Sequence, residues 1–399
     1  MSAHDPARPR LLRPTILFPV LLAFLAALFV SQSGGSADAA TGTLLRDGTG
    51  LYPRAVRLAH SGDANGRILA SVVTFSGNNG LGAIHESTDG GASFREVGTV
   101  RDPEAAGGQG LCCSTLYELP QRIGNMPAGT LLWSASVGQD EPNRRMALRV
   151  FKSTDVGRSW SYLSTIATAS NDKGLWEPEF SVDASGQLVA HYSDETDAGH
   201  SQKLVAARTA NGVNWTGHHD TVASTLASDR PGMAVVRKMG DGTYFMSFEI
   251  CAAAGQFQCV VHYRTSSDGW NWGSTTSLGI RPETADGKYF KHAPNLAWAP
   301  EAGNPKGRLF LVGQVMYNRD GSRAAGSGRT VWVNSAGGAG KWREIPAPVA
   351  VESTTIDYCP NYSSSLLPSA DGNRLLEIAT DWSGSVCKPY FATGSVPAA

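Results

Sequence analysis

One short pattern, Ser-x-Asp-x-Gly-x-x-aromatic, recurs along the chain and constrains its fold more than any other feature. Two full copies begin at Ser87 and Ser153, a shorter variant begins at Ser266, and degenerate copies occur at 209–215 and 334–342. Asp and Gly accept turn conformations, Ser and Asp side chains bond to the local backbone, and the aromatic ring can pack on a sheet. The pattern therefore predicts a repeated hairpin turn, in which the aspartates have a structural role.

A second repeat divides the chain into six units, each made of a short strand, a turn and an apolar alternating run. Ser185-Gly186 and Asp241-Gly242 are typical of the turns between them. Six units over residues 40–399 suit four-stranded blades, and no window reads as a long amphipathic helix. We therefore expect an all-β, six-bladed β-propeller with four-stranded antiparallel blades in one domain. A strand at 41–46 is expected to complete the last blade and close the ring. The units begin at Tyr52, Cys113, Glu177, Arg230, Pro294 and Tyr362.

Residues 1–39 read as a signal peptide. Three arginines precede an apolar run at 15–30, and Ala37-Asp38-Ala39 offers a small-residue cleavage site. The alternative is an uncleaved anchor, because the apolar run is almost long enough to span a bilayer. Pro19 within the run and the cleavage site favour a signal. We expect a secreted, extracellular protein that has no membrane attachment after cleavage.

Charge and cysteine content narrow the function further. The chain has 34 Lys and Arg against 35 Asp and Glu, so it lacks the basic excess that nucleic-acid binding requires. Export makes the six cysteines candidates for disulfides. Proximity in sequence favours Cys251 with Cys259 and Cys359 with Cys387, which leaves Cys112 and Cys113 as a vicinal disulfide or as free thiols. Metal binding is the weaker reading, since no C-x-x-C pair with matching histidines is present.

Strand direction sorts polar residues onto the two faces of the expected ring. If each first strand starts at one face, the Ser-x-Asp turns lie at the opposite face, and functional residues should lie away from those turns. The expected functional face collects the starts of first strands and the ends of second strands. They are Arg54, Cys113, Glu177, Arg230, Asn295, Tyr362, Asp194, Glu249, Gln314 and Asp381.

Glu177 and Glu249 are the candidates for chemistry on this face. They belong to consecutive units, so two carboxylates would meet at one central site and could act as acid and as nucleophile or base on a glycosidic bond. The alternative is that each glutamate pairs with Arg54 or Arg230 in a structural network. Glu179 should face the same side of its strand as Glu177 and competes for the same role.

Seven ordered motifs resemble glycoside hydrolase family 93, the exo-α-1,5-L-arabinanases, and the Ser-x-Asp turn resembles the Asp-box of sialidase-like propellers. The resemblance implies a secreted six-bladed propeller that releases arabinobiose from the non-reducing end of arabinan with retention, using two glutamates. These carry over to Glu177 as nucleophile and Glu249 as acid/base. The segment 291–295 departs from the family pattern. The motifs are Tyr52-Pro53-Arg54, 115–120, Trp176-Glu177-Pro178-Glu179, Tyr192-Ser193-Asp194, 202–205, Arg230-Pro231-Gly232-Met233 and Phe248-Glu249-Ile250-Cys251.

Substrate contacts are expected around the glutamate pair. Trp176 and Tyr192 could offer apolar faces to a sugar ring, and hydroxyl groups could bond to Arg54, Arg230, Asp194 and Asn295; Tyr362 completes this set. The chemistry requires no cofactor and no metal. We expect a monomer that acts on a polysaccharide or oligosaccharide.

Two other functions are weighed against this one. A sialidase would use a tyrosine nucleophile, for which Tyr358 and Tyr362 are candidates, and an arginine triad, of which only Arg54 and Arg230 are identified. A non-catalytic propeller would bind carbohydrate without cleaving it.

Overall fold

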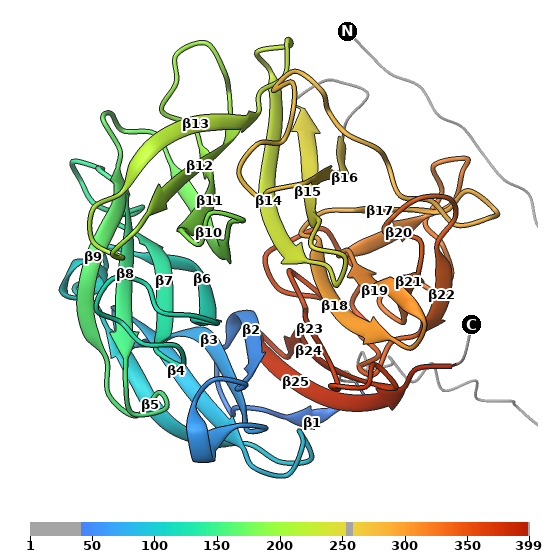
Figure 1. Cartoon of the computed structure of the whole chain (residues 1–399), viewed down its shortest axis with the longest axis horizontal. Coiled ribbons are helices and arrows are strands. Elements are labelled where there is room, and N and C mark those ends of the chain that lie inside the picture. The colour runs from blue at the N-terminus through green and yellow to red at the C-terminus, as the bar shows by residue number, and fades with distance from the viewer. Residues whose placement is uncertain (1–40, 253–257, 398–399) are drawn as a thin grey trace, which may run out of the picture. The chain divides into compact units, whose positions relative to one another are not determined.

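The computed structural model describes residues 41–252 and 258–397. In this part of the chain the strands form six antiparallel sheets, which follow one another around a ring (Figure 1). The innermost strands contact one another in the cyclic order β2, β6, β10, β14, β18, β23 and back to β2. The predicted six-bladed propeller is therefore confirmed. These strands are β2 (Leu51–Arg57), β6 (Leu111–Glu118), β10 (Leu175–Val182), β14 (Asp229–Lys238), β18 (Asn295–Glu301) and β23 (Ser365–Pro368).

Each of the first three blades contains four strands that follow one another in the sequence and are joined by turns. Two short 3-10 helices, η1 (Gly62–Ala64) and η2 (Pro103–Ala105), lie in the connections of the first blade. The outer strands of these blades are β3 (Ile68–Ser76), β4 (Asn79–Ser87), β5 (Arg95–Arg101), β7 (Leu131–Val137), β8 (Ala147–Ser153), β9 (Ser161–Thr168), β11 (Leu188–Asp194), β12 (Lys203–Thr209) and β13 (Thr216–Val222).

The fourth blade departs from the four-stranded prediction. Its sheet has five strands, because the chain returns to it twice after β16 and places two three-residue strands beyond that edge. The strands of blades four and five, besides the innermost ones, are β15 (Tyr244–Ala252), β16 (Gln258–Ser266), β17 (Tyr289–Lys291), β20 (Val315–Tyr317), β19 (Asn304–Val312), β21 (Thr330–Asn334) and β22 (Arg343–Pro346).

The N-terminal strand closes the ring as predicted. β1 (Thr43–Leu44) pairs with β25 (Val386–Ser395), which pairs with β24 (Arg374–Ser383) in the last blade. β1 is shorter than the predicted strand at 41–46. The pairing joins the two ends of the described chain in one sheet, so this edge of the last blade is covered.

The Asp-box turns are built as their sequence predicts. Asp89 accepts hydrogen bonds from the backbone N–H groups of Ala92 and Ser93, and from the hydroxyls of Ser87 and Ser93. Asp155 and Asp268 make the equivalent bonds in their own turns. The aspartates are thus occupied by the local backbone, which gives them a structural role.

Buried apolar side chains fill the spaces between blades rather than a single centre. One cluster joins blades two and three through residues such as Leu132, Val150, Phe180 and Ala190. The two expected disulfides, Cys251–Cys259 and Cys359–Cys387, are present, and of the two alternatives for Cys112 and Cys113 the structure has the vicinal disulfide. Among the described residues, no helix has the length and apolar character needed to cross a membrane. The predicted signal peptide lies outside the described residues.

Candidate active site

A repeated backbone feature shapes the centre of the ring at one face. Tyr52, Cys113, Glu177 and Met233 have positive φ angles of 52°, 63°, 54° and 59°, although none is glycine. Each lies where the register between the innermost strand and its neighbour shifts, so each belongs to a β-bulge. Blades five and six have positive-φ residues just before β18 and β23. Such angles are costly for residues with a Cβ and gather at functional sites.

Glu177 occupies the bulge of the third blade. Its Oε2 accepts a hydrogen bond of 2.7 Å from the hydroxyl of Ser193 on β11, and one of 3.3 Å from the backbone N–H of Met233 on β14. Burial raises the pKa of Glu177, while these two hydrogen bonds oppose the rise by stabilising the carboxylate. The Glu177 carboxylate is therefore held by hydrogen bonds from both blade three and blade four.

Glu249 lies on β15, next to the bulge of the fourth blade. It pairs in register with Gly232, the neighbour of Met233, and its Oε2 accepts a 2.7 Å hydrogen bond from the backbone N–H of Ala293. Burial, together with the negative charge of Glu177, raises the pKa of Glu249 to about 8, although the hydrogen bond from the Ala293 N–H opposes the rise. The two predicted glutamates are thus brought together, and burial combined with charge repulsion favours a proton on Glu249 at neutral pH.

Glu179 does not compete with Glu177, contrary to the expectation from strand alternation. The register jumps from Trp176 to Glu179, so the period-two rule fails across the bulge. Glu179 is buried, and it accepts hydrogen bonds from Arg237 at 2.5 Å and from the Thr115 hydroxyl at 2.9 Å. It is a partner in a buried ion network and is not available for chemistry.

Arg54 belongs to the same buried network as Glu179. It is buried, its Nε lies 3.8 Å from Glu179, and its Nη1 donates to the backbone carbonyl of Ser363 at 3.2 Å. Its guanidinium also stacks 4.2 Å from the ring centroid of Tyr52. The expected contact of Arg54 with a substrate hydroxyl stays a prediction, and in the described residues its guanidinium is held by partners within the protein.

Tyr362 lies in an apolar collar beside the glutamates. Burial raises the pKa of its phenol, and the charges of Glu249 and Glu177 raise it further. Its hydroxyl lies 3.6 Å from Sδ of Met233. The collar comprises four buried residues, each from a different blade, and the partly buried residues packed on them, namely Tyr52, Cys113, Met233, Ala293, Leu51, Cys112, Trp176 and Tyr362.

Arg230 and Trp176 lie at the edge of the site and share one partner. Arg230 forms an ion pair with Glu195 and donates to Oε1 of Gln202 at 2.7 Å. Burial raises the pKa of Glu195, but hydrogen bonds from Arg230 and the Trp176 indole outweigh it and hold this pKa below its usual value. The positive charge of Arg230 also favours the ionised forms of Glu177 and Glu249. Arg230 and Trp176, both predicted as substrate contacts, therefore lie near Glu177 and Glu249.

Three other predicted contacts are not directed at the glutamates. Tyr192 is buried between blades two and three, where its hydroxyl lies 3.0 Å from Nδ1 of His218. Asp194 lines the same cleft as Tyr192 and accepts hydrogen bonds from Thr196. Asn295 is buried, and its Oδ1 accepts from the backbone N–H of Leu296. Ser193, between Tyr192 and Asp194, faces the other way and contacts Glu177.

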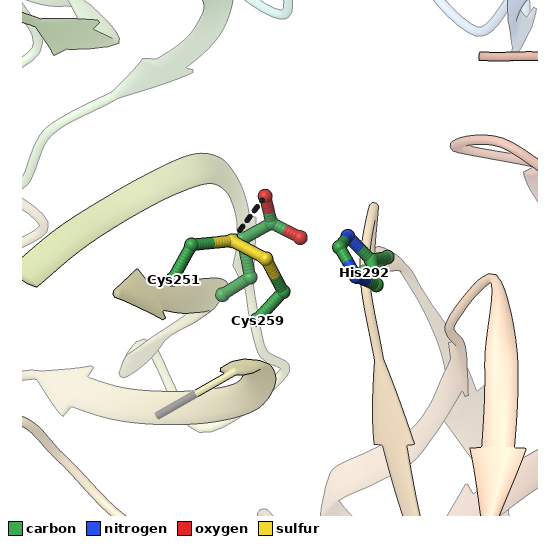
Figure 2. Close-up of side chains that lie close together, drawn as sticks. Cys251, Cys259 and His292 are labelled. Carbon is green, nitrogen blue, oxygen red and sulfur yellow. Dashed lines mark hydrogen bonds between the residues drawn. A yellow bond between two sulfur atoms is a disulfide. The ribbon is translucent and has the colours of Figure 1, made fainter. Parts of the chain in front are cut away.

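The Cys251–Cys259 disulfide lies beside Glu249 and opposite His292 (Figure 2). Sγ of Cys251 is 3.5 Å from Oε1 of Glu249. Among the described residues, these four side chains form the one His, Cys and carboxylate group close enough to surround an ion. Because metal ligation by cysteine requires thiolates, the disulfide removes two of the four ligands. The arrangement instead ties β15 to β16 beside the carboxylate.

Ser193 and the backbone N–H groups of Met233 and Ala293 are site groups that the sequence reasoning missed. Ser193 lies between Tyr192 and Asp194 in one of the seven sequence motifs. Its two neighbours were selected from the sequence as sugar contacts because of their side-chain types alone. The two N–H groups have no side-chain signal. They reach the carboxylates because Met233 and Ala293 adopt positive φ angles, of 59° and 44°.

Comparison with solved structures finds arabinan-degrading enzymes of the same architecture. Penicillium chrysogenum α-L-arabinanase complexed with arabinobiose is 25% identical, with a TM-score of 0.72 over 89% of this chain and 97% of that one. The GH93 α-L-arabinofuranosidase of Fusarium graminearum with arabinobiose is 24% identical, with a TM-score of 0.72 over 90% and 98%. The resemblance to glycoside hydrolase family 93 is confirmed. It extends over nearly the whole length of these family 93 structures.

Other comparisons are more distant than the family 93 structures. A Hadza microbial sialidase is 12% identical, with a TM-score of 0.59 over 89% of this chain and 68% of that one, and shares the fold. A scan against protein-family models finds no match, and a search of curated proteins finds none either.

Proposed function

We propose that this protein is a retaining exo-acting glycoside hydrolase that releases arabinobiose from the non-reducing end of α-1,5-L-arabinan. The observation that carries the proposal is the convergence of Glu177 and Glu249, in a chain that resembles enzymes solved with arabinobiose. Retaining cleavage needs one carboxylate that attacks and one carboxylic acid that protonates. The unequal surroundings of the two glutamates meet this need.

Glu177 is the nucleophile in this proposal. Ser193 and the Met233 N–H both donate to Oε2, and this fixes the carboxylate and favours its ionised form. Attack of the other oxygen on the anomeric carbon forms a covalent glycosyl-enzyme and breaks the bond to the leaving oxygen.

Glu249 is the acid and then the base. With a pKa raised to about 8 it carries a proton at neutral pH, which it gives to the departing glycosidic oxygen. In the second step its carboxylate takes a proton from water, and the water oxygen replaces Glu177 on the anomeric carbon. Two displacements restore the original anomeric configuration and both carboxyl groups.

Glu177→Gln and Glu249→Gln variants test the proposal on linear arabinan. Chromatography of the released sugars should show arabinobiose from the wild-type protein and a loss of at least about a thousandfold in each variant. Proton NMR of the first product should show the anomer of the substrate. Unchanged arabinobiose release by either variant would remove that glutamate from the mechanism.

The sialidase alternative is disfavoured by the arginines. Arg54 is buried in contact with Glu179, and Arg230 is paired with Glu195, so neither offers an unpaired charge to a sialic acid carboxylate. Turnover of a 4-methylumbelliferyl sialoside, and its loss in Tyr362→Phe, would reverse this conclusion. A binding-only propeller would instead bind arabinan without producing new reducing ends.

We also propose that the protein is secreted and acts as a monomer. Three disulfides are consistent with an oxidising compartment. The β1–β25 pairing covers the edge of the last blade, which could otherwise pair with a second copy. N-terminal sequencing of exported protein should begin at Ala40, and light scattering should give the mass of one chain.

A further inference from the structure

A polar cleft is lined by Arg230 and Glu195, at the edge of the candidate active site, on the face away from the Asp-box turns. It has a volume of about 720 Å³ and lies among the loops that precede β10, join β11 to β12 and precede β14. A second cleft of about 590 Å³ shares Arg144, Asn171 and Asp172 with it. The two clefts are therefore continuous, and Arg144 lies where they meet.

The cleft is connected to the proposed chemistry through Trp176 and Arg230. Arg230 lines the cleft, and its charge acts on both Glu177 and Glu249. Glu195, also in the lining, receives the indole N–H of Trp176. The Arg144 guanidinium lies 5.3 Å from the centroid of the Trp176 ring. A ligand that extends from the glutamates past Trp176 would therefore enter the cleft beside Arg144.

The charges in the cleft favour an uncharged ligand with many hydroxyl groups. Arg144, Lys173 and Arg230 are balanced by Asp172, Glu195 and Asp197. Arg230 is paired with Glu195, and Asp197 accepts a 2.7 Å bond from Lys203, so these charges are compensated within the protein. Such groups can still donate to or accept from a hydroxyl. A carboxylate or phosphate would find no excess of positive charge.

We propose that this cleft binds the sugar residues of the arabinan chain beyond those at the scissile bond, and that Arg144 is its main specificity-determining residue. This inference rests on the proposed function. A guanidinium carries five N–H donors, and Nη2 of Arg144 makes a 3.0 Å contact with Sδ of Met146. The remaining donors are placed at the junction of the two clefts, where a chain of sugars would pass.

Linear arabino-oligosaccharides of three to six residues provide the test. We expect kcat/KM of the wild-type protein to rise with each residue that enters the cleft. Arg144→Ala should lose about tenfold in kcat/KM on the longest substrate, through KM, because a hydrogen bond to a charged donor is removed. On the trisaccharide the variant should match the wild type, which also shows that it is folded.

Arg95→Ala is the matched control, since Arg95 is an exposed arginine that begins β5 directly after an Asp-box turn. It should leave the dependence on chain length unchanged. A wild-type rate that does not rise with chain length, or an Arg144→Ala variant that keeps the rise, would overturn the cleft assignment. Failure of the wild-type protein to cleave any of the oligosaccharides would instead overturn the proposed function.

Discussion

The hydroxyl of Ser193 donates a 2.7 Å hydrogen bond to Oε2 of Glu177 from the neighbouring strand of the same blade. The same hydroxyl oxygen lies 3.2 Å from the backbone N–H of Met233 in the next blade. Ser193 therefore links the bulges of two blades to one carboxylate. This position makes it a positioning residue for the proposed nucleophile.

Ser193→Ala should lower kcat on arabinan by about tenfold, because a hydrogen bond to a charged group contributes about 1.5 kcal/mol. The bond also lowers the pKa of Glu177, so its loss should raise that pKa and move the acidic limb of the pH–rate profile to higher pH. Kinetics across the acid range measures both effects. A lower rate with an unmoved acidic limb would point to a packing role alone.

The basic limb of the pH profile should come from Glu249. Activity should fall as the pH rises through about 8, where Glu249 loses the proton that it must donate. In Glu249→Gln this limb should vanish, and the remaining activity should be greatest on aryl glycosides whose leaving groups need no proton. A basic limb that persists in Glu249→Gln would assign it to another group.

The propeller could be predicted from the sequence because its signals are local. Asp89 and Asp155 lie in turns whose hydrogen bonds all come from residues within four positions, so the motif determines the structure by itself. The pair Glu177 and Glu249 followed from the order of the units and from family resemblance. Both depend on patterns that a linear sequence displays.

The finer arrangement of the site could not be predicted, because it depends on the bulges. Glutamate and methionine are not residue types that favour a positive φ, so the sequence does not predict this angle at Glu177 or Met233. Each bulge also reverses the alternation of side chains along its strand, which was used to predict the face on which each side chain lies. Glu179 was therefore expected beside Glu177, and Tyr192 was expected at the site in place of Ser193. The burial of Arg54 against Glu179 could not be foreseen either, because the direction in which Glu179 faces depends on the same bulge.

The buried ion network around Glu179 should contribute to stability. Glu179→Ala would leave Arg54 buried without its carboxylate and should destabilise the protein by about 3 kcal/mol. Urea unfolding at pH 7 gives the value. Glu96→Ala is the control, because Glu96 forms an exposed pair with Arg46 and should cost less than about 1 kcal/mol. Equal losses in the two variants would contradict the buried network.

Glu377 on β24 is a buried carboxyl group outside the candidate active site, so it tests the effect of burial alone on a pKa. It is buried, accepts a 3.0 Å hydrogen bond from the Val349 N–H, and has its pKa raised to about 8 by burial. Glu377 therefore keeps its proton in the folded state up to about pH 8, whereas in the unfolded state it loses the proton near pH 4.5. The free energy of unfolding consequently falls as the pH rises from about 4.5 to 8. Glu377→Gln keeps the neutral form at every pH.

The melting temperature of Glu377→Gln, relative to wild type, should therefore increase between pH 6 and pH 9, by about 5 °C. The pH–rate profile on arabinan should stay as in the wild-type protein, because Glu377 contacts neither glutamate of the site. Glu249→Gln should show a similar gain in relative stability at pH 9 but should lose the basic limb of activity. If Glu377→Gln melts with the same offset from wild type at both pH values, the carboxyl is already ionised at pH 6, and burial alone does not raise pKa values in this core.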